Sequence, residues 1–258
     1  MSEKTSKKSF SRKKKVLLVV AVILLAFIIG VVRYLTFSLP ADEEAVAAMA
    51  SKKDVIVEEV GNTIVFNPVN EKTNIGYIYY PGGQVDPKSF AYAAEKIAES
   101  GIKVVIQKMP FNLAFFGKDR ALDVIDSYPE IDKWYIGGFS LGGVAASMVA
   151  SDNPDKFEGI ILYASYTTKK YSLANTDLEV LSLSGSNDGL ATPEKIEAGK
   201  DFLPASATYV EIPGGNHTQM AVYGDGNLQK GDNKAGLSRM EQQKTIIEDT
   251  VKFIKNEK

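Results

Sequence analysis

Residues 134–146 read Trp-Tyr-Ile-Gly-Gly-Phe-Ser-Leu-Gly-Gly-Val-Ala-Ala and contain the run Gly138-Phe139-Ser140-Leu141-Gly142. A strand-like segment precedes this G-x-S-x-G run and a small-residue helix follows it. At such a junction the glycines are needed because the chain turns sharply and side chains at the flanking positions would clash. The alternative is a glycine-rich turn without a chemical role. The junction predicts that Ser140 is a nucleophile on a tight strand-to-helix turn.

A serine nucleophile needs a base, and the base needs an acid that orients it. The chain has one histidine, His217, a few residues after a predicted strand at 208–212. Asp188 follows another predicted strand, in the run Gly-Ser-Asn-Asp-Gly. A lone histidine is more often a surface or core residue, and an aspartate in such a run is often simple turn chemistry. The order Ser140, Asp188, His217, each after a strand, favours a catalytic triad instead.

The oxyanion hole that such a triad requires should combine two backbone N–H groups. The first belongs to Leu141. The second is expected in the loop Tyr80-Pro81-Gly82-Gly83-Gln84, at Gly83 or, as second choice, at Gln84. A simple Pro-Gly turn is the alternative.

Strand-like and helix-like segments alternate through the body of the chain, which is typical of a mostly parallel sheet with helices on both faces. Gly61-Asn62 predicts a hairpin, and Asp86-Pro87 predicts a helix start. The expected strands are 55–57, 63–66, 74–80, 103–107, 134–137, 159–164, 178–184 and 208–212, and the expected helices 87–101, 120–126, 142–150, 193–202 and 240–255.

Five motifs together resemble the small α/β hydrolases related to dienelactone hydrolase. They are YYPGGQVDP, MPFNLAFFG, WYIGGFSLGG, LSGSNDGL and PGGNHTQMAVYGDG, and the likeness covers about residues 55–256. The resemblance implies an α/β-hydrolase fold with about eight strands, and hydrolysis of a carboxylic ester or lactone through an acyl-enzyme. Ser140 stands where dienelactone hydrolase has cysteine, so the resemblance does not by itself imply specificity for lactones over esters.

The expected substrate site is shallow and open. The connection at 165–177, where this fold often carries a cap, has thirteen residues, too few for a helical lid domain. Small acyl groups or an accessible polymer end therefore fit better than long buried chains. We expect the walls to come from the following residues, of which about half should prove to be core: Gln84, Met109, Phe111, Phe115, Phe116, Tyr166 and Tyr223.

The N-terminal segment indicates export. Residues 16–32 form a run of seventeen residues without a charge, after a cluster of lysines and an arginine. At about 1.5 Å per residue the run spans about 26 Å, close to a hydrocarbon core. The positive charge before it places residues 1–15 in the cytoplasm. We expect a signal-anchor at 16–33, a stalk or linker at 34–53 and the catalytic domain at 54–258. The alternative is a cleaved signal peptide and a secreted body.

The composition of the chain excludes several classes of function. Residues 34–258 hold 22 basic and 31 acidic residues, so nucleic acid is an unsuitable partner. The chain has no cysteine and one histidine, which excludes thiolate catalysis and nitrogen- or sulfur-ligated metal sites. We expect no cofactor, no metal, a monomer, and a small-molecule or cell-surface ester as substrate. Acyl transfer to a cell-surface acceptor and a catalytically silent binding module remain open alternatives.

Overall fold

The computed structural model describes residues 11–70 and 72–256. The chain divides into two compact units, Met1–Phe37 and Ser38–Lys258. In the first unit, helix α1 (Arg12–Thr36) has 25 residues and no buried side chain. Its most apolar stretch has a mean hydropathy of 3.1, so α1 is long and apolar enough to cross a membrane. The predicted apolar N-terminal helix is therefore present, whereas the basic residues Lys4, Lys7 and Lys8 lie outside the described residues.

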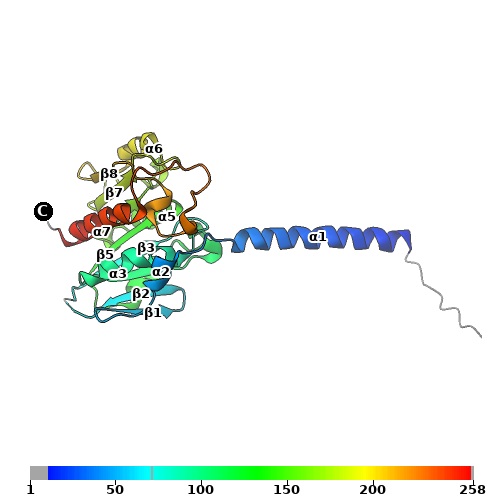
Figure 1. Cartoon of the computed structure of the whole chain (residues 1–258), viewed down its shortest axis with the longest axis horizontal. Coiled ribbons are helices and arrows are strands. Elements are labelled where there is room, and N and C mark those ends of the chain that lie inside the picture. The colour runs from blue at the N-terminus through cyan, green and yellow to red at the C-terminus, as the bar shows by residue number, and fades with distance from the viewer. Residues whose placement is uncertain (1–10, 71, 257–258) are drawn as a thin grey trace, which may run out of the picture. The chain divides into compact units, whose positions relative to one another are not determined.

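The second unit is built on one eight-stranded sheet in the order β1-β2-β4-β3-β5-β6-β7-β8 (Figure 1). Strand β2 pairs antiparallel with both β1 and β4, and all pairings among β3 to β8 are parallel. The strands are β1 (Val55–Val60), β2 (Thr63–Pro68), β3 (Ile75–Tyr80), β4 (Lys103–Gln107), β5 (Lys133–Phe139), β6 (Gly159–Tyr163), β7 (Glu179–Gly185) and β8 (Thr208–Ile212). This confirms the predicted α/β-hydrolase fold, because each apolar segment that was expected to be a strand lies in the sheet.

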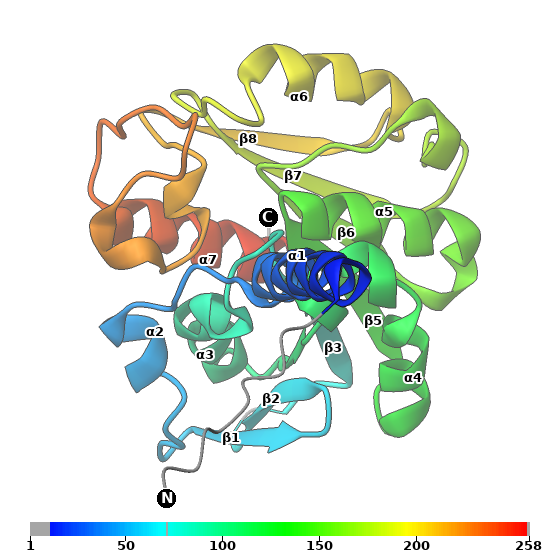
Figure 2. The ribbon, with the colours of Figure 1, turned by 90° about the vertical axis from the view of Figure 1, so that its right-hand side faces the viewer.

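Helices cover both faces of the sheet, as Figure 2 shows. Helices α3 (Ala91–Glu99) and α7 (Arg239–Lys255) pack on one face, and α4 (Arg120–Ser127) and α5 (Leu141–Asp152) pack on the other. Helix α6 (Pro193–Gly199) follows β7. The connection from β6 to β7 carries one short 3-10 turn, Lys169–Tyr171, and no inserted domain. The carboxyl ends of the parallel strands are consequently left without a large cap.

Two helix starts follow from side chains that cap free backbone N–H groups. The Asp86 carboxylate accepts a hydrogen bond from the Lys88 N–H at 2.9 Å, but the first turn, Pro87–Phe90, is a 3-10 helix and α3 begins only at Ala91. At α7, Ser238 and Glu241 form a capping box, which is a strong local start signal.

The expected stalk is wrong for residues 38–53, which belong to the folded unit. Leu39 and Ala41 form β-bridges with Val85 and Tyr223. The short helix α2 (Glu43–Ala47) buries Ala45 completely. Next to it, the buried Asp42 carboxylate pairs with Arg239 at the start of α7. Alternating alanines in an otherwise polar segment are a weak signal of burial, so the sequence alone suggested a linker.

Candidate active site

Ser140 stands on the turn between β5 and α5 in a strained backbone conformation. Its φ is 52° and its ψ is −119°, a region that side-chain-bearing residues seldom occupy. A Cβ on Gly138 would lie 2.5 Å from the Gly142 carbonyl carbon, and a Cβ on Gly142 would lie 2.1 Å from the Tyr80 oxygen. The two glycines therefore allow α5 to begin directly against β3 and β5. The turn projects Ser140 at the carboxyl edge of the sheet.

Two hydrogen bonds hold the Ser140 backbone in this turn. The Ser140 N–H donates to the Tyr163 oxygen at 3.0 Å, and the Ser165 hydroxyl donates to the Ser140 carbonyl at 2.8 Å. Ser165 is 2% exposed. No sequence signal pointed to Ser165, because nothing local distinguishes it from any other serine after a strand.

Asp188 and His217 form a buried pair. His217 Nδ1 donates to Asp188 Oδ2 at 2.8 Å, and both side chains are almost fully enclosed. The other carboxylate oxygen of Asp188 accepts the N–H groups of Leu190 and Ala191, both at 2.7 Å. With three hydrogen bonds, the carboxylate has a fixed orientation.

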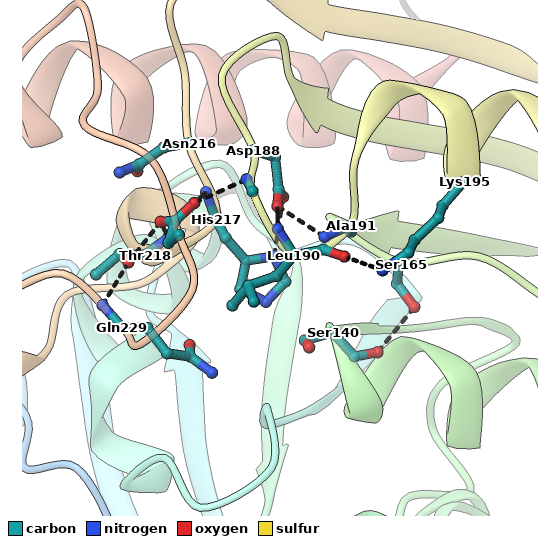
Figure 3. A network of polar contacts seen from close by, with 12 residues as sticks. Ser140, Ser165, Asp188, Leu190, Ala191, Lys195, Asn216, His217, Thr218 and Gln229 are labelled. Atoms are coloured by element: carbon teal, nitrogen blue, oxygen red, sulfur yellow. Dashed lines mark hydrogen bonds and ion pairs between the residues drawn. The ribbon is translucent and has the colours of Figure 1, made fainter.

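The second ring nitrogen of His217 differs from the first in its contacts. His217 Nε2 is buried and has no hydrogen-bond partner among the described residues. Figure 3 shows the imidazole ring between the Asp188 carboxylate and Ser140. The ring of Phe139 lies against it with a centroid separation of 4.7 Å. The structure thus joins Asp188 to His217 directly and places Ser140 on the side of the ring away from Asp188, while a catalytic role for the three residues stays a prediction.

Asp232 links the loops that carry Asp188 and His217. Its Oδ1 accepts the N–H groups of Gly189 at 3.0 Å and His217 at 3.3 Å. Its Oδ2 accepts the N–H and the hydroxyl of Thr218 at 2.8 and 2.6 Å. Burial raises the pKa of Asp232, but the hydrogen bonds from Thr218, Gly189 and Asn233 stabilise the charged form and the net pKa is lowered. No sequence signal pointed to Asp232, which lies in an irregular loop.

Helix α7 supports the histidine loop from the other side. The Gln242 side chain accepts from the Asn216 N–H at 3.0 Å and donates to the Asn216 oxygen at 2.8 Å. Asn216 Nδ2 also donates to the Asn233 oxygen at 2.7 Å. Because Gln242 is fully buried, this pairing fixes the backbone just before His217. A glutamine among the inward-facing positions of the predicted helix was its only sequence signal.

The two expected oxyanion donors lie next to one another. A Cβ on Gly83 would be 3.0 Å from Leu141 Cδ2, so the loop after β3 passes close to the start of α5. The Leu141 N–H is the first of the helix and has no intrahelical partner. The Gln84 N–H, by contrast, donates to the Asn112 oxygen at 2.9 Å. The second-choice donor Gln84 is therefore engaged elsewhere, which favours Gly83.

The expected pocket walls divide into core and surface. Met109 and Tyr223 are 7% and 1% exposed and belong to the core, in line with the expectation that about half of these residues are core. The Tyr223 hydroxyl donates to Gln229 at 2.8 Å. Tyr166 is half-buried against the sheet and α6. Phe111, Phe115 and Phe116 are exposed on the segment between β4 and α4.

Among the residues that the structure describes, no group of histidine, cysteine, aspartate and glutamate side chains could hold a metal ion.

The fold and this site define an α/β hydrolase. The model of the alpha/beta hydrolase family matches residues 76–244, and the chain belongs to that family. No curated protein gives a significant match.

Three solved structures share the fold at low sequence identity. A dienelactone hydrolase from Anabaena variabilis has a TM-score of 0.60 and 15% identity over 79% of this chain and 98% of its own. A hyperthermophilic esterase from the archaeon Pyrobaculum calidifontis has a TM-score of 0.60 and 16% identity, over 83% and 88%. A predicted CIB-like hydrolase from Thermoplasma acidophilum has a TM-score of 0.54 and 17% identity, over 78% and 98%. At such identities the likeness shows the fold alone.

Proposed function

We propose that this protein is a serine hydrolase that cleaves a carboxylic ester or lactone through an acyl-enzyme. The observation that carries the proposal is the buried His217–Asp188 pair at 2.8 Å, with an unpartnered Nε2 beside a serine in a strained turn. A buried polar atom without a partner is costly. That cost is explained if Nε2 accepts a proton during the reaction.

The chemistry proceeds in two halves. Ser140 Oγ attacks the carbonyl carbon while His217 Nε2 accepts its proton, and Asp188 stabilises the imidazolium that forms. The Leu141 and Gly83 N–H groups bind the developing oxyanion. The tetrahedral adduct collapses, and the leaving alcohol takes the proton from His217. Water then attacks the acyl-enzyme with His217 again as the base, which releases the acid and restores Ser140.

The substrate class follows from the open edge of the sheet. The β6–β7 connection carries no inserted domain, and the phenylalanines beside the site are exposed. A site of this kind suits a small acyl group or an accessible ester on a larger molecule rather than a fully enclosed chain. Two of the solved structures that share the fold are named as an esterase and a dienelactone hydrolase, names that refer to cleavage of an ester and of a lactone.

The same proposal places the catalytic unit outside the cytoplasm. Helix α1 contains a stretch apolar enough to cross a membrane, and Arg12-Lys13-Lys14-Lys15 stand at its start. The positive-inside rule then puts the start of α1 in the cytoplasm and the second unit on the other side.

Labelling with a fluorophosphonate probe tests the proposal, followed by a series of p-nitrophenyl esters of rising chain length. The parent should label at Ser140. Ser140→Ala should abolish labelling and lower ester turnover by ~10³-fold or more, and His217→Ala combined with it should add little because the triad acts as a unit. Ser127→Ala, an exposed serine on α4, is the matched control and should keep the parent rate. Labelling that persists in Ser140→Ala would disprove the assignment.

A further inference from the structure

Residues 109–117, between β4 and α4, form an uncharged loop that we call the phenylalanine loop. Phe111, Phe115 and Phe116 expose 49%, 47% and 61% of their surface. The rings of Phe111 and Phe116 pack edge to face with centroids 5.6 Å apart, so they present one apolar surface. Clustered exposed aromatic rings usually mark a site at which another apolar surface binds.

The backbone of this loop holds the rings outward at an energetic cost. Phe111 and Asn112 have φ values of 56° and 53°, in the left-handed region that side chains disfavour. The loop is nevertheless fixed at its centre, because the Asn112 oxygen accepts the Gln84 N–H at 2.9 Å. Exposure of the phenylalanines is thus built into an anchored loop.

The point where the chain enters the folded unit lies beside this loop. The Leu39 N–H donates to the Gln84 oxygen at 2.7 Å, and Gln84 is the residue that binds Asn112. Helix α1 ends at Thr36, three residues before Leu39. An extended chain covers at most about 3.6 Å per residue, so Leu39 stays within about 11 Å of the end of α1, whatever angle the folded unit takes.

The catalytic edge adjoins the same loop. Leu113 Cδ2 would lie 3.7 Å from a Cβ on Gly83, and Leu141 Cδ2 would lie 3.0 Å from it. The phenylalanine loop therefore flanks the expected oxyanion donors.

We propose that the phenylalanine loop docks on the lipid bilayer that α1 spans, so that the catalytic edge faces the membrane surface. A bilayer is the expected binding partner because residues 37–38, which we call the tether, connect Leu39 directly to α1. A bilayer that holds α1 therefore lies within reach of Leu39 in every copy of the chain. Aromatic side chains are favoured at the membrane–water interface. The proposal rests on the membrane insertion of α1 and extends the proposed function, because an ester carried in the membrane would meet Ser140 from this side.

Single-cysteine labelling tests the docking, since the chain contains no cysteine of its own. The full chain carries an environment-sensitive fluorophore at Phe116→Cys, in nanodiscs of phosphatidylcholine and phosphatidylglycerol. Nitroxide lipids report contact with the bilayer, and iodide reports contact with water. Val69→Cys is the matched control, because Val69 is apolar and 39% exposed. It follows β2, whose last residues lie beside the start of β4, so it is at the amino ends of the parallel strands, away from the catalytic edge. Phe27→Cys, within α1, verifies insertion.

The expected result is a blue-shifted Phe116 label that nitroxide lipids quench and iodide does not, with the reverse at Val69. Adding Phe111→Ser should lower the ratio of docked to undocked molecules by roughly tenfold, because the burial of one large apolar side chain in the bilayer is lost. Quenching of the Phe116 label by iodide alone, while Phe27 remains lipid-quenched, overturns the proposal. Shielding from both quenchers with a dependence on protein concentration also overturns it, because a second copy would then cover the loop. None of these measurements depends on ester turnover. Failure of the docking proposal and failure of the proposed hydrolase activity can therefore be told apart.

Discussion

At the residue scale, the site depends on side chains that orient other side chains. Asp188 holds the His217 ring through Nδ1 at 2.8 Å. Asp232 holds the backbone of His217 and of Gly189 with one carboxylate oxygen. Asp232 thus ties the loop of Asp188 to the loop of His217, so under the proposed mechanism it is a positioning residue.

Asp232→Asn should lower kcat by roughly 10- to 100-fold with little change in KM, since small displacements of a catalytic base are costly. The amide keeps one oxygen, but its NH₂ group would face either the Thr218 donors or the N–H groups of Gly189 and His217. Steady-state kinetics on a soluble ester measure the effect. Asp225→Asn removes the same charge from an exposed position and should leave kcat unchanged. An equal loss in both variants would contradict the positioning role.

The lowered pKa of Asp232 also predicts a pH dependence of stability. A carboxylate whose pKa falls on folding stabilises the folded state above its unfolded pKa, which is 3.8 for an ordinary aspartate, and loses that contribution as the pH falls through the folded pKa. The free energy of unfolding of the parent should therefore exceed that of Asp232→Asn most clearly above pH 3.8. Below that pH the difference should shrink. Urea unfolding of both proteins across this range measures it, and a difference independent of pH would speak against a charged Asp232.

At the scale of elements, β3, β5 and α5 meet so closely that a side chain cannot be accommodated. A Cβ on Gly142 would lie 2.1 Å from the Tyr80 oxygen and 2.4 Å from the Pro81 oxygen. Both are backbone atoms and cannot rotate away. This contact also brings the loop of Gly83 next to Leu141.

Gly142→Ala should therefore destabilise the fold by about 3 kcal/mol or more, at the upper end of overpacking effects, and should abolish ester turnover. Thermal unfolding and the ester assay together measure this. Ser151→Ala, on the same helix and half-buried, should change stability by no more than about 0.5 kcal/mol. Normal stability of Gly142→Ala would mean that α5 starts farther from β3 than the structure indicates.

At the scale of the whole molecule, the N-terminal segment of the folded unit is part of its architecture. Asp42 pairs with Arg239, and Asp42 Oδ1 accepts the Asp225 N–H at 2.7 Å. The entry of the chain is thereby fixed to α7 and to the loop that follows His217. The tether leaves the folded unit from a defined point, which the docking proposal requires.

Topology is testable with the same cysteine-free background. An impermeant maleimide should label Ser206→Cys, in the exposed turn before β8, in intact cells. Ser11→Cys, before α1, should be labelled only after permeabilisation, because the basic start of α1 favours the cytoplasm. The opposite pattern would reverse the proposed orientation, and recovery of the folded unit free in the medium would indicate cleavage.

The sequence by itself determined the class of fold, the apolar N-terminal helix, and the candidates Ser140, Asp188 and His217. These features depend on residues that are close together in the sequence. Continuous apolar runs indicate buried strands, and glycines indicate the turn after β5. A single histidine left one choice of base. Each of the three lies just after a strand of the sheet, and their joint catalytic role stays a prediction.

Only the tertiary structure decided which distant segments support one another. Asp42 and Arg239 are 197 residues apart in the chain, and Asp232 lies 43 residues after Gly189. No local pattern records such pairings, because they depend on how loops meet after the sheet has formed. For the same reason Tyr223 is core while Phe116 is exposed, although both are aromatic residues in loops: burial is decided by what packs on a side chain, and the residue type alone does not specify that.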